Sequence, residues 1–372
     1  MTDTTVAGAG GHSDEGDHHE EMPRVVFTRR RLLASIVFVV SVAAFLYFVL
    51  PKLLGLRDTW NRIQHGNGWW LALAALLEVC SFLGYIALFR VVCARGDSRI
   101  DWRASYQITM SGLAATRLFA SAGAGGIALT AWALRRSGLE RRVVACRLMA
   151  FLVLLYGVYM AALVIVGLGL YTGLFPGSNP FALTVVPAIF GATVIAIFLA
   201  VSLLPGDFDR LVRRWGHGGR AGRAAASLAT APAAAASGVR TAIDLVRTRD
   251  VNLLGAVAWW GFDIAVLWAC FHAFGGSPPT AVVIMSYFIG MVGNTLPLPG
   301  GIGGVDGGMI GAFTAFGVPV QLAVVAVLAY RGFAFWLPTL PGAVAYLQLR
   351  RTVHRWQLRP RPAIPDAATA HR

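Results

Sequence analysis

The stretch "NTLPLPGGIGGVDGGM" (residues 294–309) interrupts the most hydrophobic part of the chain. It combines two prolines, several paired glycines and a single acidic residue, Asp306. Between residues 251 and 349 the only other charged side chains are Asp263 and Arg331. Irregular backbone and a carboxylate are tolerated inside a membrane only where protein or a water-filled cavity covers them. The stretch therefore predicts a polar site inside a membrane protein.

The composition is that of a polytopic membrane protein. The 372 residues are 56% hydrophobic and only 13% charged, whereas soluble domains carry about 25% charged residues. Several uncharged runs exceed the roughly 18 residues that a helix needs to cross a bilayer. We therefore predict an all-α polytopic membrane protein, because a β-barrel would instead show short segments of alternating hydrophobicity.

Two kinds of apolar segment are present. Six runs are long enough for full spans: residues 32–51, 68–92, 146–171, 181–204, 251–275 and 320–348. Residues 104–134 and 281–317 are also apolar, but each has a glycine-rich break in its middle. Each of these two regions is expected to form two half-length helices joined by a bend, as in a re-entrant hairpin.

The distribution of arginine predicts the orientation. The net charge is +14, and most of the 32 basic residues lie in alternate connecting segments, the pattern of cytoplasmic loops. The basic charge is thus explained without nucleic acid. We expect a multi-pass protein of the cell inner (plasma) membrane with both termini in the cytoplasm. Hairpin 104–134 then enters from the cytoplasm, and hairpin 281–317 enters from outside.

The two hairpins resemble each other. "AGAGGIALTAWALRRSG" (122–138) parallels "GGIGGVDGGMIGAFTAFG" (300–317). The matched positions are Gly125 with Gly303, Gly126 with Gly304, and Gly138 with Gly317. Similar halves of opposite orientation form the inverted repeat of many transporters, whose site lies where broken helices meet. The predicted halves are residues 31–204 and 251–350.

Three segments lie outside these halves. Residues 1–30 are polar and acidic and are predicted to be a disordered cytoplasmic tail, with a metal site at its histidines as the alternative. The Arg- and Ala-rich segment 205–250 is expected to form helices on the inner membrane face or a solvated linker. Residues 351–372 are predicted to be a basic cytoplasmic tail. We expect no metal or cofactor.

Asp306 and Arg331 are the first candidates for a headgroup-binding site. Arg331 can pair with Asp306 or bind a phosphate with two parallel hydrogen bonds. A buried ion pair that only stabilises helix packing is the alternative. Further candidates are the glycines of the break, whose backbone amides can face a cavity, and the polar residues that precede each break. They are Gly300, Gly301, Gly303, Gly304, Asn294 and Arg117. Arg117 could instead extend to the inner surface.

Glu78 and Asp263 are candidates for proton or ion coupling. Each lies in the middle of a predicted span, at roughly equivalent positions of the two halves. Intramembrane acids often relay protons. A hydrogen bond between helices is the alternative role.

The second half resembles a known family. "PLPGGIGGVDGGMIGAFTAFGVPVQLAVVAVLAYRGFAFWLPTLPGAVAYL" (297–347) is similar to the C-terminal signature of the lysylphosphatidylglycerol synthase transmembrane region, also described as flippase-like. The resemblance covers about residues 30–350. Many members carry Glu at the position of Asp306. The matching positions are Pro299, Gly300, Gly301, Gly303, Asp306, Gly317 and Arg331.

The resemblance implies lipid transport. In two-domain synthases this region moves aminoacylated phosphatidylglycerol between leaflets, and a separate soluble domain makes that lipid. Only a short tail follows the last predicted span, so we expect no lysyl transfer and no enzyme activity. The expected function is a flippase for a phospholipid or a polyprenyl-phosphate-linked glycolipid in envelope biogenesis. The alternatives are a non-transporting scaffold, for example for an envelope glycosyltransferase, and an enzyme acting on lipid headgroups.

Overall fold

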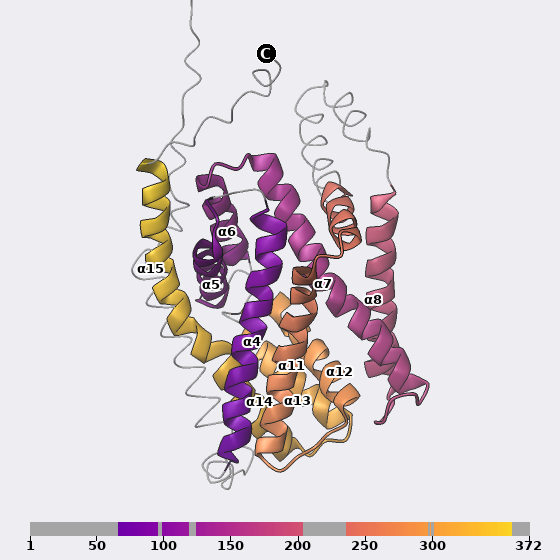
Figure 1. Cartoon of the computed structure of the whole chain (residues 1–372). Coiled ribbons are helices and arrows are strands. Elements are labelled where there is room, and N and C mark those ends of the chain that lie inside the picture. Colours follow the sequence, from indigo (N-terminus) through magenta and orange to yellow (C-terminus); the bar gives the residue numbers. More distant parts are fainter. Residues whose placement is uncertain are drawn as a thin grey trace, which may run out of the picture.

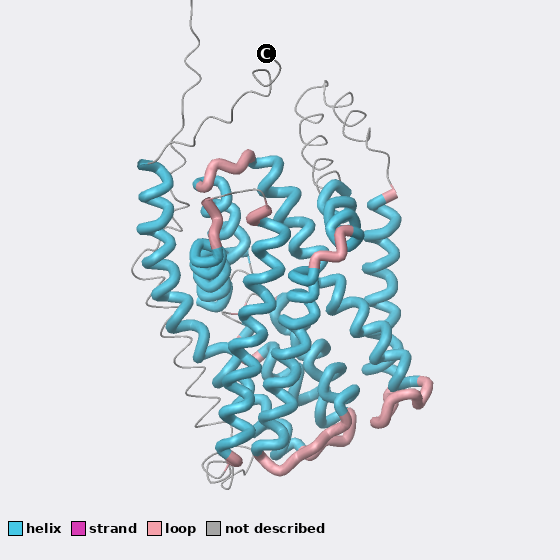
Figure 2. Tube along the Cα trace, viewed as in Figure 1, coloured by secondary structure: helices cyan, strands magenta, loops and turns pink. Residues whose placement is uncertain are grey.

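The computed structural model describes residues 66–95, 99–118, 124–203, 236–296, 298 and 301–358. Within these ranges the regular structure is helical and contains no strand, which confirms the predicted all-α fold (Figures 1 and 2). Several predictions lie outside the described residues: the tail 1–30, the span 32–51, the bend at 119–123, most of segment 205–250, and the end of the basic tail.

Full-length apolar helices account for the expected spans. Among the described residues, five are long and apolar enough to cross a membrane: Gly68–Cys93 (α4), Arg141–Tyr171 (α7), Phe181–Ser202 (α8), Val251–Ala273 and Val320–Leu358. The fourth consists of the short helix η2 (Val251–Leu254) and α11 (Gly255–Ala273). These helices correspond to the predicted spans that begin at residues 68, 146, 181, 251 and 320.

The two interrupted regions form helical hairpins, as predicted. The first contains α5 (Trp102–Leu118) and α6 (Ala124–Arg136). The second contains α12 (Thr280–Met291), which continues into η3 (Val292–Thr295), and α13 (Gly304–Ala315). A helix of 12 or 13 residues is about 20 Å long, too short for the roughly 30 Å hydrocarbon core.

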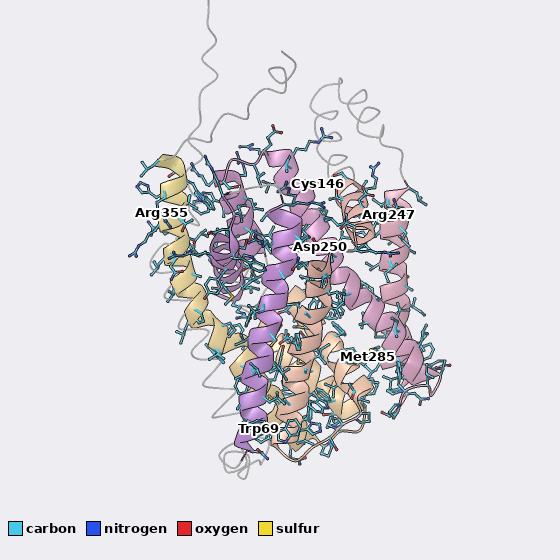
Figure 3. All side chains as sticks on the ribbon, in the orientation of Figure 1. Trp69, Cys146, Arg247, Asp250, Met285 and Arg355 are labelled. Carbon is cyan, nitrogen blue, oxygen red and sulfur yellow. The ribbon has the colours of Figure 1, made fainter. Side chains whose placement is uncertain are left out.

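The hairpins occupy opposite halves of the molecule (Figure 1). Helices α5 and α6 lie towards the end that carries Arg247 and Arg355, whereas α12 and α13 lie towards the end that carries Trp69 (Figure 3). This placement agrees with the expectation that the two hairpins enter the membrane from opposite sides.

The last span is bent, a departure from the single helix expected over 320–348. It consists of α14 (Val320–Arg331), a π-turn (η5, Gly332–Trp336) and α15 (Leu337–Leu358). A π-turn and prolines both interrupt the regular hydrogen bonding of a helix. Pro338 and Pro341 follow the turn directly, and α15 leaves α14 at an angle in Figure 1. The helix also continues to Leu358, beyond the expected boundary.

Helices α4 and α11 form the centre of the fold and join the two halves. They approach closely because glycines lie where they cross: a Cβ atom on Gly84 would stand 2.7 Å from the Ala258 side chain, and one on Gly255 would stand 2.3 Å from the Gly84 carbonyl oxygen. The Ser81 hydroxyl donates a hydrogen bond to the Trp259 carbonyl at 2.9 Å across the same interface.

The helix contacts repeat in the two halves. In the first half α4 contacts α5 and α7, α5 contacts α6, and α6 contacts α7. In the second half α11 contacts α12 and α14, α12 contacts α13, and α13 contacts α14. Each half also packs against the other, because α5 contacts α15 and α12 contacts α7. This is the arrangement that the predicted inverted repeat requires.

The turns after the two hairpins are the same. Gly138 and Gly317 have φ angles of 101° and 90°, values that favour glycine. Gly138 N–H donates to Arg135 O and Leu139 N–H to Leu134 O, while Gly317 N–H donates to Thr314 O and Val318 N–H to Phe313 O. The sequence match between these two glycines therefore reflects one repeated helix end.

The described part of segment 205–250 includes a helix over residues 236–247. Its apolar face is buried, with Ala236, Val239 and Ala242 each 2% exposed. It packs on α7, where the Cys146 sulfur and the Thr241 hydroxyl lie 3.3 Å apart. This part of the segment is therefore attached to the membrane helices and is not a solvated linker.

Candidate functional site

Five charged side chains from five helices interact at the centre of the molecule. We refer to this set as the central charge cluster: Glu78 on α4, Arg117 on α5, Asp263 on α11, Asp306 on α13 and Arg331 on α14. The Asp306 and Arg331 side chains form an ion pair, and Arg117 interacts electrostatically with Glu78, Asp263 and Arg331. The sequence predicted all five residues individually. The structure brings them together from both halves.

Asp306 is held by the break that precedes it. Gly303 adopts φ +86° and directly precedes α13 as its N-cap, and its N–H donates a hydrogen bond of 2.8 Å to Asp306 Oδ2. The aspartate thereby accepts from the exposed amide end of the helix, where a negative charge is favourable. Its other oxygen, Oδ1, lies 2.7 Å from Arg331 Nε. Both side chains are buried, with exposed fractions of 2% and 11%.

Arg331 and Arg117 converge on the π-turn. The Arg331 guanidinium lies 4.9 Å from the centre of the Phe335 ring, and the Arg117 guanidinium lies 5.8 Å from the same centre. Arg117 Nη1 also donates to the Phe335 carbonyl oxygen at 3.4 Å. Two guanidinium groups near one aromatic ring and an interrupted helix could bind a phosphate group by parallel hydrogen bonds.

Arg117 points inward. It lies in the last turn of α5, the deep end of the first hairpin, and its guanidinium also lies 5.7 Å from the Phe82 ring. Its interactions with Glu78 and Asp263 place it among the central residues. Extension to the inner surface, the alternative raised by the sequence, is therefore not the conformation of this side chain.

Glu78 and Asp263 form a carboxyl pair. Their side chains interact electrostatically between α4 and α11, and they are 2% and 5% exposed. The hydroxyl groups of Tyr287 and Tyr330 both donate to Asp263 Oδ2, the latter at 3.0 Å. The sequence did not indicate either tyrosine as a site residue. The only available signal was that Tyr330 directly precedes Arg331 in the "YR" pair.

The glycines of the break have different roles. Gly301 has φ +65°, and a Cβ atom there would stand 2.3 Å from the Asn294 side-chain oxygen. Gly304 of α13 packs on Gly293 of η3, where the two arms of the second hairpin cross. Gly300 lies outside the described residues. Asn294 is exposed and its Nδ2 contacts the Met291 sulfur at 3.2 Å. No described contact joins Asn294 to the central charge cluster.

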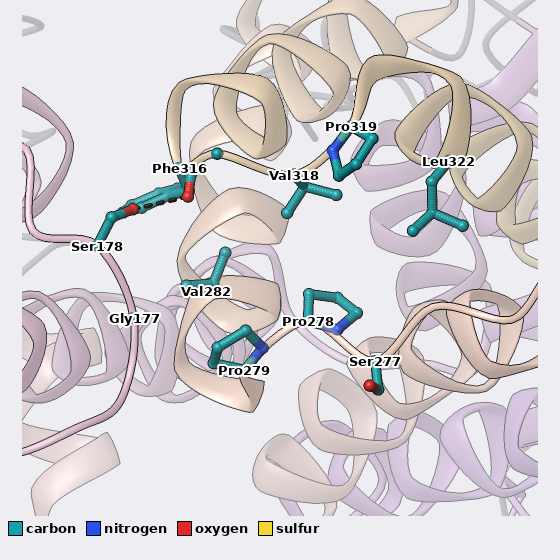
Figure 4. A pocket seen from close by; sticks show the side chains of 11 residues that line it. Gly177, Ser178, Ser277, Pro278, Pro279, Val282, Phe316, Val318, Pro319 and Leu322 are labelled. Carbon is teal, nitrogen blue, oxygen red and sulfur yellow. Dashed lines mark hydrogen bonds between the residues drawn. The ribbon is translucent and has the colours of Figure 1, made fainter.

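A separate cavity of about 290 Å³ lies at the end of the second hairpin where α12 begins and α13 ends (Figure 4). Pro278, Pro279, Phe316 and Leu322 contribute to its lining, and no charged side chain does. The Ser178 hydroxyl closes one side by donating to the Phe316 carbonyl at 2.7 Å. The cavity is suited to an apolar group. Within the described ranges, no group of three His, Cys, Asp or Glu side chains could hold a metal ion.

Known proteins share this sequence pattern. The family model of the lysylphosphatidylglycerol synthase TM region matches residues 32–342. A UPF0104 membrane protein of Methanothermobacter thermautotrophicus is 32% identical over 109 residues, which are 29% of this chain and 31% of that protein. A UPF0104 membrane protein of Methanocaldococcus jannaschii is 32% identical over 95 residues, 25% of this chain and 28% of that protein.

These pairwise matches span about a third or less of the length of the curated relatives. The family model, in contrast, extends over most of the chain, from the predicted first span to α15. The chain therefore belongs to the lysylphosphatidylglycerol synthase transmembrane region family.

Proposed function

We propose that this chain is a lipid flippase that moves a phospholipid or a polyprenyl-phosphate-linked glycolipid between leaflets during envelope biogenesis. The observation that carries the proposal is the position of Arg117 and Arg331. These cations lie at the centre of the fold, one on a hairpin and one beside the other hairpin, which has the opposite orientation. In transporters with inverted repeats, the substrate site lies where such broken helices meet.

In this proposal the phosphate of the headgroup binds Arg331 and Arg117, while the acyl or prenyl chains remain in the lipid. Asp306 holds Arg331 in place until the headgroup arrives. The ion pair is buried, so the conformation described here is a closed one. The π-turn and the prolines that follow it are positions where α14 and α15 could change their relative angle and open a path.

The proposal includes a location and an orientation. The protein lies in the cell inner membrane with both termini in the cytoplasm, so that the arginine-rich end in Figure 3 faces the cytoplasm. Its partners are membrane lipids, with an envelope glycosyltransferase as a candidate protein partner. The role assigned is transport, with no chemical step and no cofactor.

Transfer of fluorescent phosphatidylglycerol in liposomes containing the purified protein tests the proposal. Asp306→Asn and Arg331→Gln are expected to lower the transfer rate at least about tenfold, since a hydrogen bond to a charged group contributes about 1.5–3 kcal/mol. Both substitutions also leave one buried charge unpaired and therefore cost stability, so transfer is compared only for variants that elute as folded protein in size exclusion.

The chain offers a matched control in an exposed ion pair. Asp244 and Arg247 lie 3.6 Å apart on the helix 236–247, with side chains 73% and 77% exposed. Asp244→Asn and Arg247→Gln should transfer lipid like the wild type. Equal transfer by all four variants would reject the proposed site. No transfer by the wild type of either phosphatidylglycerol or a polyprenyl phosphate would reject the proposal and favour a non-transporting scaffold.

A further inference from the structure

The Glu78–Asp263 pair has features that helix packing does not require. It joins the two halves at the α4–α11 crossing, where both side chains are buried. Two tyrosine hydroxyls donate to Asp263 Oδ2. Asp263 Oδ1 and Glu78 Oε2 are completely buried and receive no hydrogen bond from the N–H or O–H donors of the described residues. A proton on either carboxyl group would supply the donor that these oxygens lack.

Buried carboxyl oxygens that have no hydrogen-bond donor favour a bound proton. An ionised carboxylate only accepts hydrogen bonds, and a protonated one can donate. Two adjacent carboxylates in a low-dielectric site also repel each other strongly. The pair therefore holds at least one proton, and it can hold a second. Carboxyl groups that interact this closely bind and release protons as one unit.

Arg117 connects this pair to the proposed headgroup site. Its guanidinium interacts with both acids of the pair and also with Arg331, and it reaches Phe335 of the π-turn. A change in the charge of the pair therefore alters the field at the position where an anion would bind. Arg331 is less directly coupled to the carboxyl pair than Arg117 is, because its ion-pair partner is Asp306.

The charges of the cluster are balanced when the pair holds one proton. The two arginines then compensate Asp306 and the one remaining negative charge of the pair. An anionic phosphate group entering this site would add an uncompensated negative charge, which is costly in a buried site. A second proton on the pair removes that cost. The other ionisable groups facing the pair are Cys270, which interacts with Glu78, and Tyr287 and Tyr330, which both donate hydrogen bonds to Asp263.

We propose that Glu78 and Asp263 form a proton-binding site whose second proton is taken up when an anionic phosphate group binds near Arg117. This inference rests on the proposed function in that the phosphate belongs to a lipid headgroup. Linkage is reciprocal, so the anion raises the affinity for the proton and the proton raises the affinity for the anion. Transport of an anionic lipid would then be driven by a proton gradient.

Binding to the purified full-length protein in detergent tests the linkage without requiring transport. The probes are dihexanoyl phosphatidylglycerol, zwitterionic dihexanoyl phosphatidylcholine and inorganic phosphate, with tryptophan fluorescence as the readout. For one linked proton, the affinity for phosphatidylglycerol should rise on acidification by up to about tenfold per pH unit. The affinity for phosphatidylcholine should change less with pH, because its choline cation offsets the charge of its phosphate.

The double variant Glu78→Gln/Asp263→Asn mimics the fully protonated pair. It should bind phosphatidylglycerol with the affinity that the wild type reaches at acidic pH, and independently of pH. The exposed variant Asp244→Asn is the control and should keep the wild-type pH dependence. A wild type whose affinity does not depend on pH, or a double variant that keeps the dependence, would overturn the inference.

Proton uptake by the wild type gives a measurement that does not depend on any variant folding. In weakly buffered solution with a pH indicator, about one proton should be taken up per phosphatidylglycerol bound at a pH where the pair holds one proton. Binding without proton uptake across the pH range would overturn the inference even if the double variant cannot be purified.

The probes also separate this inference from the proposed function. Proton-linked binding of phosphatidylglycerol, together with no leaflet transfer in liposomes, would support the linkage and reject the flippase proposal. Proton-linked binding of inorganic phosphate alone would support the linkage and assign the site to a free anion. Leaflet transfer without proton linkage would support the flippase and overturn the linkage.

Discussion

At the scale of single residues, the Asp306–Arg331 pair is both a candidate site and a structural contact. Asp306 accepts a hydrogen bond from Gly303 N–H and forms an ion pair with Arg331, so removing the carboxylate leaves a buried guanidinium without its nearest negative charge. Breaking a buried ion pair by removing one partner costs about 3–5 kcal/mol, whereas replacing both partners by apolar groups can be neutral. The contribution of the pair to stability and its contribution to transport can be measured separately.

We expect Asp306→Ala to lower the free energy of unfolding by about 3–5 kcal/mol. The double variant Asp306→Ala/Arg331→Met should regain most of that loss, because no unpaired charge remains. Thermal unfolding in detergent measures both changes. If the double variant is stable and still transfers lipid, the pair serves helix packing alone. If it is stable and inactive, the pair is needed for transport.

The sequence predicted single site residues better than their partners. A charge in a long apolar run is visible without a structure, so Glu78, Asp263, Asp306 and Arg331 could be identified. The interaction between Glu78 and Asp263 depends on how α4 crosses α11, which no local pattern specifies. Tyr287 was missed because tyrosine is common in apolar spans. Only the hydrogen bond that it donates to Asp263 identifies it as a residue of the site.

At the scale of elements, the hairpins depend on close contact between short helices. In the first hairpin, a Cβ atom on Gly126 would stand 2.5 Å from the Gly112 carbonyl oxygen and 2.1 Å from the Thr116 hydroxyl. The second hairpin crosses at Gly293 and Gly304 in the same manner. Small residues at helix crossings are typical of membrane proteins, where packing replaces the hydrophobic effect as the driving force.

Gly126→Ala should therefore destabilise the protein by about 1–3 kcal/mol, as overpacking does. Gly157→Ala is the matched control, since a Cβ atom there would meet nothing within 4 Å. That change, in the middle of α7, should be neutral or stabilising by up to about 1 kcal/mol. Melting temperatures from fluorescence-detected size exclusion compare the two. Equal melting temperatures for the two variants would show that α5 and α6 can move apart without loss of stability.

The sequence predicted the existence of these elements, and the positions of their bends less well. The breaks of both hairpins were visible as glycine-rich interruptions. The bend between α14 and α15 was less clear, because residues 332–336 ("GFAFW") read as an ordinary apolar run. The π-turn there arises in the folded protein, where Phe335 lies near the guanidinium groups of Arg117 and Arg331. Pro338 and Pro341 were the only sequence signals of this bend.

At the scale of the whole molecule, the repeat explains why the charge cluster is central. Each half supplies one span with an acid, α4 or α11, and one hairpin, and the halves exchange contacts through α5 with α15 and α12 with α7. The sequence showed this only through a few matched glycines. The charges themselves are not repeated: Asp306 has Ala128 at the equivalent position of the first hairpin. The site is therefore an asymmetric addition to a symmetric scaffold.

The orientation of the helices in the membrane can be tested at one residue from each end of the molecule. Asn179 lies in an exposed loop between α7 and α8, and Arg247 lies at the arginine-rich end. Because arginine-rich segments remain in the cytoplasm, a cysteine in place of Asn179 should react with a membrane-impermeant maleimide on intact cells. A cysteine in place of Arg247 should react only after permeabilisation.

The four native cysteines define the background of this experiment. Cys93 and Cys270 are buried, and Cys80 and Cys146 are partly buried, so the parent protein should label weakly on intact cells. Labelling of both new cysteines on intact cells, or of the Arg247 position alone, would contradict the orientation. It would also reverse the proposed entry sides of the two hairpins, because α5 and α6 lie at the end that carries Arg247.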